Sequence, residues 1–89
     1  MYKITINRIR DIIVQLVPMP TMIKEYDKHV SCFYMFHKSY IIFDFTEQHV
    51  SITYFQDGEF FKDAEIIPIY DIEYMNIVIS DFASRIGMS

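Results

Sequence analysis

The first part of the chain has a helical spacing of hydrophobic residues that stops at a proline. Hydrophobic side chains recur every three or four positions at Ile6, Ile9, Ile13 and Leu16. This spacing predicts a helix over residues 5–17, with Thr5 as its cap and Pro18 just beyond its end. An alternative interpretation makes residues 2–6 a short strand and moves the helix cap to Asn7.

The middle of the chain changes to the shorter periods that are typical of strands. Four strands are predicted over residues 30–36, 40–46, 50–55 and 60–62, with turns at 38–39, 47–48 and 57–58. The strongest turn signal is Asp57-Gly58, because a type I′ hairpin turn needs positive φ at both positions. Residues 18–28 are ambiguous: Pro18 and Pro20 bracket a loop, and residues 21–26 fit either an edge strand or a single helical turn. Residues 66–69 are an edge segment at most, because Pro68 has no N–H to donate.

The last part of the chain returns to helical spacing. Hydrophobic residues at Ile72, Met75, Ile79, Phe82 and Ile86 share one face of the predicted helix. Asp71 is suited to cap its start and Gly87 its end. The predicted fold is therefore α+β, with an N-terminal helix, an antiparallel four-stranded meander and a C-terminal helix in a single domain of residues 1–89.

Two-residue turns also predict which side chains share a face of the sheet. They pair Phe36 with Ile41, Tyr34 with Phe43, Cys32 with Phe45, Phe45 with Val50, Phe43 with Ile52 and Tyr54 with Phe61. These residues form one apolar face, which we interpret as the core. The opposite face holds six further apolar residues, which are the candidate apolar interface: Phe33, Met35, Tyr40, Ile42, Phe55 and Phe60.

The second apolar face leaves three interpretations open. One helix can cover each face, or both helices can cover the core face and leave the other for a partner or a second copy. A one-residue slip in the first or second hairpin would instead exchange the two faces.

Composition places the chain among folded proteins, since 52% of its residues are hydrophobic and 17% aromatic. Cys32 is the only cysteine, which rules out an intrachain disulfide and fits a reducing compartment. No apolar run approaches the roughly 20 residues of a membrane span, and the start of the chain does not resemble a signal peptide. We therefore expect a cytoplasmic protein without membrane contact. Abundant isoleucine with scarce leucine and alanine indicates an AT-rich genome, that is, a low-GC bacterium or its phage or plasmid.

The charges are divided along the chain. Residues 1–43 hold six basic and three acidic residues, whereas residues 44–81 hold nine acidic residues and one lysine. An Asp-x-Glu pattern defines a candidate acidic binding surface: Asp57, Glu59, Asp63, Glu65, Asp71 and Glu73. Residues two apart on a strand are about 6.6 Å apart on the same side, which is close to the spacing of nucleic-acid phosphates. The alternative is a solvated surface that protects an edge strand from pairing with other chains.

Signals for chemistry are weak. His29, Cys32 and His37 do not converge on one strand face, and two glycines cannot form a glycine-rich phosphate loop. We expect no enzyme, no metal site and no cofactor. The basic residues Arg8 and Arg10, with Lys3 nearby, suggest a DNA-binding helix, but the acidic balance argues against direct nucleic-acid binding.

These features favour a non-enzymatic protein-interaction module. In size, charge and helix–sheet–helix order the chain is similar to small acidic proteins of phages and mobile elements, including anti-CRISPR and anti-restriction inhibitors. This similarity implies a nucleic-acid-binding host protein as the partner of the acidic surface. The first alternative is a self-assembling structural or regulatory subunit, such as a homodimer, that uses the apolar interface. The second is a DNA-binding regulator that uses the first helix.

Overall fold

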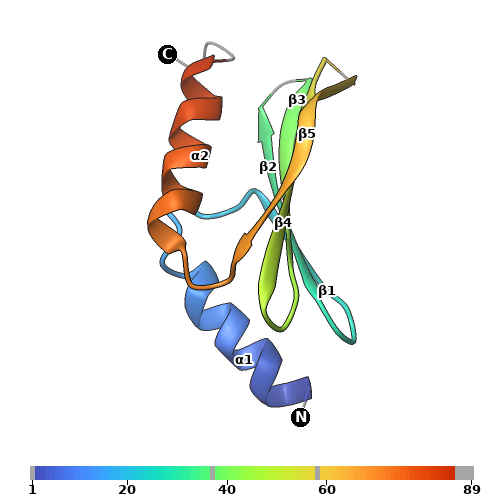
Figure 1. Ribbon diagram of the computed structural model, residues 1–89, viewed down its shortest axis with the longest axis vertical. Coiled ribbons are helices and arrows are strands. Elements are labelled where there is room, and N and C mark those ends of the chain that lie inside the picture. The colour runs from blue at the N-terminus through green and yellow to red at the C-terminus, as the bar shows by residue number, and fades with distance from the viewer. Residues whose placement is uncertain (1, 37, 58, 86–89) are drawn as a thin grey trace.

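The computed structural model describes residues 2–36, 38–57 and 59–85, without the side chains of residues 2–6, 60–63 and 85. Along the chain, one helix precedes the antiparallel sheet and a second helix follows it (Figure 1). The helices are α1 (Tyr2–Ile13) and α2 (Ile72–Arg85). The strands are β1 (Met22–Glu25), β2 (Val30–Phe36), β3 (Ser39–Phe45), β4 (His49–Gln56) and β5 (Glu59–Pro68). The predicted α+β class is confirmed.

The sheet has five strands, and the prediction of four is wrong. Strands that follow one another in the chain are neighbours in the sheet, in the order β1-β2-β3-β4-β5. The additional strand is β1, whose four residues are all exposed and therefore show no alternation of buried and exposed positions. Strand β5 is longer than predicted and continues to Pro68. Proline is tolerated there because β5 is an edge strand.

Helix α1 begins and ends earlier than predicted. Because it starts at Tyr2, neither Thr5 nor Asn7 is its cap, and the alternative strand over residues 2–6 is wrong. After the helix the chain turns more tightly, and the N–H of Leu16 donates to the carbonyl of Ile13 at 3.0 Å. This i→i+3 turn keeps Leu16 in the core, so the hydrophobic spacing runs past the end of the α-helix.

Helix α2 begins next to the predicted cap. The Asp71 carboxylate accepts a hydrogen bond from the N–H of Tyr74 at 3.2 Å, which satisfies one of the free donors of the first turn. Its buried face carries Met75, Val78, Ile79 and Phe82. The predicted positions Ile86 and Gly87 lie outside the described residues.

The register of the first hairpin differs from the predicted one by two residues. Phe36 pairs with Ser39, so Ser39 belongs to β3 and the predicted turn at Lys38-Ser39 is wrong. Consequently Tyr34 pairs with Ile41, and the predicted pairs of Phe36, Tyr34 and Cys32 are each displaced. A shift of two residues leaves every side chain on the same face, because side chains alternate with a period of two. The predicted faces therefore survive the wrong register.

The other two hairpins follow the prediction more closely. Phe45 pairs with Val50 and Phe43 with Ile52, as expected. In the last hairpin Gln56 pairs with Glu59 around the predicted turn, and Asp57 has a φ of 56°. The other residue of this turn, Gly58, lies outside the described residues.

Strand β5 contains irregularities that the sequence did not reveal. Tyr54 pairs with Lys62, so the predicted pair of Tyr54 with Phe61 is wrong. A second register shift lies between the pairs of Ile52 and Tyr54, and it brings Glu65 opposite Ile52. Each extra residue exchanges the faces of the residues that follow it, so the two shifts together restore the original alternation from Glu65 onward. The shifts therefore change the pairing of β5 but not the faces of Glu65 and Ile66.

Both helices pack on the same face of the sheet (Figure 1). The single core unites α1 residues such as Ile9 and α2 residues such as Ile79 with the predicted core face of the sheet. Its members from the sheet are Val30, Cys32, Tyr34, Ile41, Phe43, Phe45, Val50, Ile52 and Tyr54. The interpretation that one helix covers each face is wrong, and so is the slip that exchanges the faces. The other face of the sheet has no helix over it in the described part of the chain.

Candidate protein-binding face

The face of the sheet that points away from the helices, called the open face below, is built from three rows of side chains. Residues paired across strands lie side by side on one face. The first row contains Met35, Tyr40 and Phe55, and the second contains Met22, Phe33, Ile42 and Thr53. The third contains Lys24, Ser31, Asp44, Ser51 and Ile66. Two of the three rows are thus mainly apolar.

Five of the six residues of the predicted apolar interface have described side chains, and all five belong to these rows. Met35 is 51% exposed, while Phe33, Tyr40, Ile42 and Phe55 are half-buried. The rings of Tyr40 and Phe55 stack with their centroids 4.6 Å apart. The side chain of Phe60 lies outside the described residues. Neighbouring strands therefore shield these side chains only in part.

Ile42 lies at the centre of the open face. It is the middle residue of β3, and β3 is the middle strand of the five. Phe33 flanks it on β2 and Thr53 on β4. A contact that covers the face has to cover Ile42.

The polar row carries little unbalanced charge. The hydroxyl of Ser31 donates a hydrogen bond to Oδ1 of Asp44 on the neighbouring strand. Ser31 is buried and Asp44 half-buried, so this contact is built into the sheet. Lys24 and Asp44 are the charged residues among the described side chains of the three rows. The open face is thus close to neutral.

The predicted acidic surface is divided by the fold. Asp57 and Glu59 are exposed at the β4–β5 turn, whereas Asp71 and Glu73 are exposed at the start of α2. In Figure 1 this turn lies at the top of the sheet, whereas α2 starts near the middle of the view on the helix side. The side chain of Asp63 lies outside the described residues. The acidic residues with described positions therefore form two separate groups.

Glu65 lies on the helix side of the sheet, between β4 and α2. Its carboxylate accepts hydrogen bonds from the hydroxyl of Tyr54 and, at 2.7 Å, from that of Tyr74. Burial, followed by the bond to Glu65, raises the pKa of Tyr54. The bond to Glu65 is the main cause that raises the pKa of Tyr74. Glu65 thus joins β4, β5 and α2.

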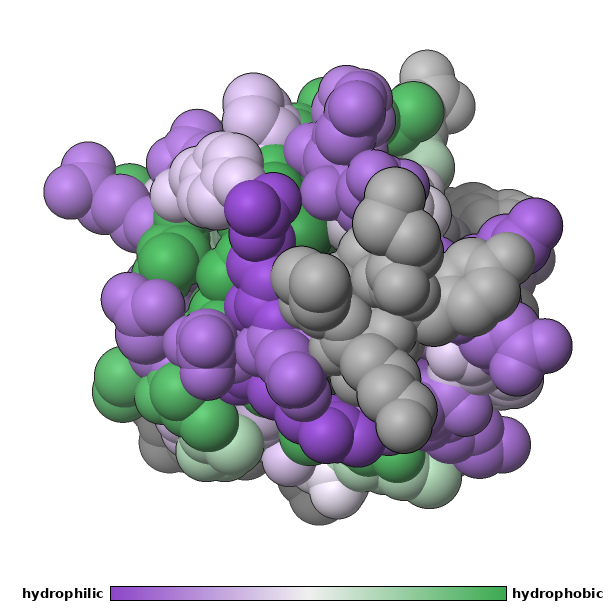
Figure 2. Space-filling model, turned by 90° about the horizontal axis from the view of Figure 1, so that it is seen from below, coloured by the Kyte–Doolittle hydropathy of each residue, from purple (hydrophilic) through white to green (hydrophobic). Residues whose placement is uncertain are grey.

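The basic residues of α1 interact with neighbouring parts of the chain. Both guanidinium nitrogens Nε and Nη2 of Arg10 donate to the carboxylate of Glu25, at 2.8 and 2.6 Å. The guanidinium of Arg8 lies over the ring of Tyr70, 5.6 Å from its centroid. Lys3 has no described side chain. The contacts of Arg8 and Arg10 favour an α1 that is tied to its own domain over one that reads DNA. Seen from the end where α1 begins, the surface mixes hydrophilic and hydrophobic residues (Figure 2).

Of the residues considered for metal binding or catalysis, the structure describes Cys32 and His29, and each has a separate environment. Cys32 is buried in the core, where burial raises the pKa of its thiol to about 12. His29 stacks on Tyr26 with the ring centroids 4.4 Å apart, and His37 lies outside the described residues. No metal-binding group of His, Cys, Asp or Glu occurs among the side chains that are described. Within the same part of the chain, no helix has the length and apolar character needed to cross a membrane.

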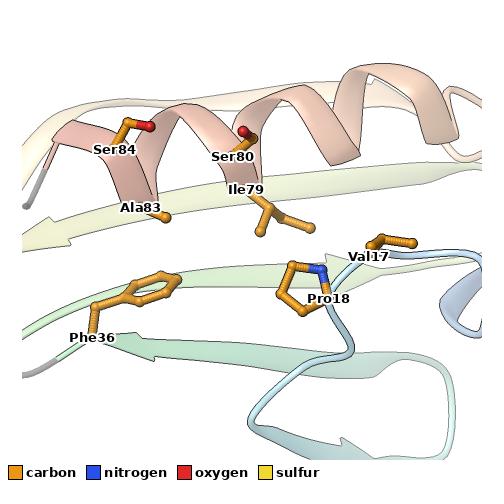
Figure 3. Close-up of a pocket in the computed structure, with 7 residues that line it drawn as sticks. All are labelled: Val17, Pro18, Phe36, Ile79, Ser80, Ala83 and Ser84. Atoms are coloured by element: carbon orange, nitrogen blue, oxygen red, sulfur yellow. The ribbon is translucent and has the colours of Figure 1, made fainter. Parts of the chain in front are cut away.

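A groove of about 380 Å³ lies between α2 and the chain entering the sheet (Figure 3). Its walls are formed by Val17, Pro18, Phe36, Ile79, Ser80, Ala83 and Ser84. Phe36 and Pro18 face the helix across it, and the two serines stand on the helix. Among the described residues that line it, the hydroxyl groups of Ser80 and Ser84 are the polar side-chain groups.

No family model, curated protein or solved structure significantly matches this chain. Function is therefore inferred from the surfaces of the chain itself. The strand pattern located most of the open face but missed Met22 and Ile66, which are 40% and 71% exposed. Met22 lies on β1, in the segment for which the sequence left an edge strand or a helical turn open, and Ile66 lies in the segment that was an edge segment at most. Neither segment could be given a register from the sequence, so neither residue was assigned to a face.

Proposed function

We propose that the chain is a non-enzymatic protein-interaction module that binds a protein partner through the open face. One observation supports this most strongly: both helices lie on one face of the sheet, which leaves two apolar rows on the other. In soluble monomers, contiguous apolar patches of several hundred Å² usually mark contact sites.

The shape of the open face favours a macromolecular partner. Small-molecule sites are generally concave and enclose most of their ligand. The open face is instead the broad surface of a five-stranded sheet, with half-buried Phe33, Ile42 and Phe55 across its middle. Aromatic and methionine side chains, which are enriched in the cores of protein interfaces, form much of its surface.

The test compares proteins captured from a lysate of a low-GC bacterium by sparsely immobilised wild-type chain and two variants. Ile42→Asp introduces a charge at the centre of the open face. Ile77→Asp introduces the same charge on α2, where the isoleucine is 48% exposed. A protein retained by the wild type and Ile77→Asp, but lost with Ile42→Asp, supports the proposal. Equal capture by both variants contradicts it, provided that circular dichroism shows both to be folded.

A second candidate function uses the acidic residues. Exposed Asp57 and Glu59 form one acidic group and exposed Asp71 and Glu73 another, within a segment that holds nine acids and one lysine. This distribution favours a phage or mobile-element inhibitor of the anti-CRISPR or anti-restriction type, which binds a basic nucleic-acid-handling protein.

Charge reversal separates this candidate from the first. Asp57→Lys with Glu59→Lys should abolish capture of a basic partner and leave capture through Ile42 unchanged. Raising the salt concentration from 50 to 500 mM should weaken binding to the acidic groups, because such attraction is screened. Binding that survives both changes argues against an acidic surface as the binding site.

A further inference from the structure

We infer that the occupant of the open face is a second copy of the same chain, which forms a face-to-face homodimer. This inference rests on the proposed function and specifies its partner. The described charged side chains of the face are Lys24 at one edge and Asp44, which accepts a hydrogen bond from Ser31. A face with so little charge is complementary to another apolar, neutral face, and a second copy supplies one.

The position of Ile42 suits a two-fold arrangement. In a symmetric dimer the same patch is used by both subunits, and residues on the axis meet their own equivalents. Ile42 is the middle residue of the middle strand, so an axis through the centre of the face brings the two Ile42 side chains together. Phe33 and Tyr40 then pack around this contact, as inward-facing residues do between the sheets of a sandwich.

The acidic residues are placed so that they do not oppose this contact. Asp57 and Glu59 lie at the β4–β5 turn, and Asp71 and Glu73 lie at the start of the helix that covers the other face. Glu65 is also turned toward that helix through its bonds to two tyrosines. The formal net charge of −4 is thus carried largely outside the open face.

The area of the open face is enough for a weak dimer. Five strands about 4.8 Å apart span roughly 24 Å, and three rows about 6.8 Å apart span roughly 20 Å. Each copy then buries about 500 Å², or about 1,000 Å² in total, when the face is treated as flat. This lies at the low end of specific interfaces, so a dissociation constant in the micromolar range is expected.

Sedimentation velocity of the full chain from about 1 to 300 μM provides the test. The wild type and Ile77→Asp should convert from monomer to dimer with the same midpoint. Ile42→Asp and Met35→Asp should shift that midpoint at least tenfold upward, and circular dichroism should show that both are folded. Met35 is 51% exposed, so its substitution tests the face with little risk to the fold.

Self-association that is equal at 50 and 500 mM salt and lost with both open-face variants supports the dimer. A wild type that is monomeric at every concentration overturns the inference, as does a dimer that both variants retain. The proposed function is tested separately, by asking whether the immobilised chain captures a protein in a way that depends on Ile42. The immobilised chains are spaced too sparsely to pair with one another in that experiment. A monomeric chain with such capture therefore refutes the second copy alone.

Discussion

Removal of the Glu65 carboxylate should destabilise the domain more than removal of an exposed acid from the same strand. The perturbation is Glu65→Ala, which takes an acceptor from the hydroxyls of Tyr54 and Tyr74. Tyr54 is only 4% exposed, so its bond to a charged acceptor contributes about 1.5–3 kcal/mol. Tyr74 is half-buried, and its bond should contribute about 0.5–1 kcal/mol. The free energy of unfolding should fall by about 2–4 kcal/mol.

Urea denaturation at pH 7, followed by circular dichroism, measures this loss. Glu59→Ala serves as the matched control, because Glu59 is an exposed acid at the start of β5 and its removal should change stability by less than about 0.5 kcal/mol. Glu65→Gln, which keeps one acceptor oxygen, should lie between the two. A Glu65→Ala variant as stable as the control would refute the structural role of this carboxylate.

Three further predictions concern the packing of the core and α2. Stability should decrease as pH rises from about 9 toward 12. Burial in the folded state raises the pKa of the Cys32 thiol to about 12, so the thiol ionises first in the unfolded chain. A free energy of unfolding that stays constant over this range would contradict the burial of the thiol. Asp71→Ala should cost about 1 kcal/mol in urea denaturation through loss of the α2 cap, while Asp81→Ala, an exposed acid within the same helix, should cost less. Asn76→Ala should lower the free energy of unfolding by about 1–2 kcal/mol. The Asn76 side chain accepts a hydrogen bond from the N–H of Val17 at 2.8 Å and donates one to the carbonyl of Gln15 at 3.4 Å. Unchanged stability would show that these contacts do not hold α2 to the chain before the sheet.

The sequence predicts the two faces of the sheet better than it predicts the pairs within them. Alternation assigns Ile41 to the core and Ile42 to the opposite face whichever turn joins β2 to β3. The sequence between Phe36 and Ser39 carries no strong turn signal, so the predicted pairs were displaced by two residues. A displacement by two preserves the faces, which is why the core prediction remained correct.

The fold separates acidic residues that the Asp-x-Glu spacing grouped together. Alternation along β5 gives Glu59 and Glu65 the same face, and because the two register shifts cancel, Glu65 still lies on that face, toward Tyr54 and Tyr74. The spacing alone did not show that α2 covers this face beside Glu65. The shifts themselves had no sequence signal, because residues 59–65 contain no glycine or proline.

The number of helices on each face also could not be decided from the sequence. Both helices have one hydrophobic face, and either arrangement would bury it. Packing of Ile9 and Ile79 into one core resolves this choice only once the chain directions after Pro18 and Pro68 are known. The open face therefore depends on the tertiary structure. Alternation predicted the residues on this face, but a face without a helix over it was only one of three interpretations.

The most direct test of the open face compares two neighbouring isoleucines of β3. Ile41 is fully buried in the core, whereas Ile42 is half-buried on the open face. At about 1 μM protein, where the monomer should dominate, Ile41→Ala should lower the free energy of unfolding by about 2–5 kcal/mol and Ile42→Ala by about 1 kcal/mol or less. Equal losses for the two variants would show that Ile42 is packed within the monomer, and that the sheet has no open face.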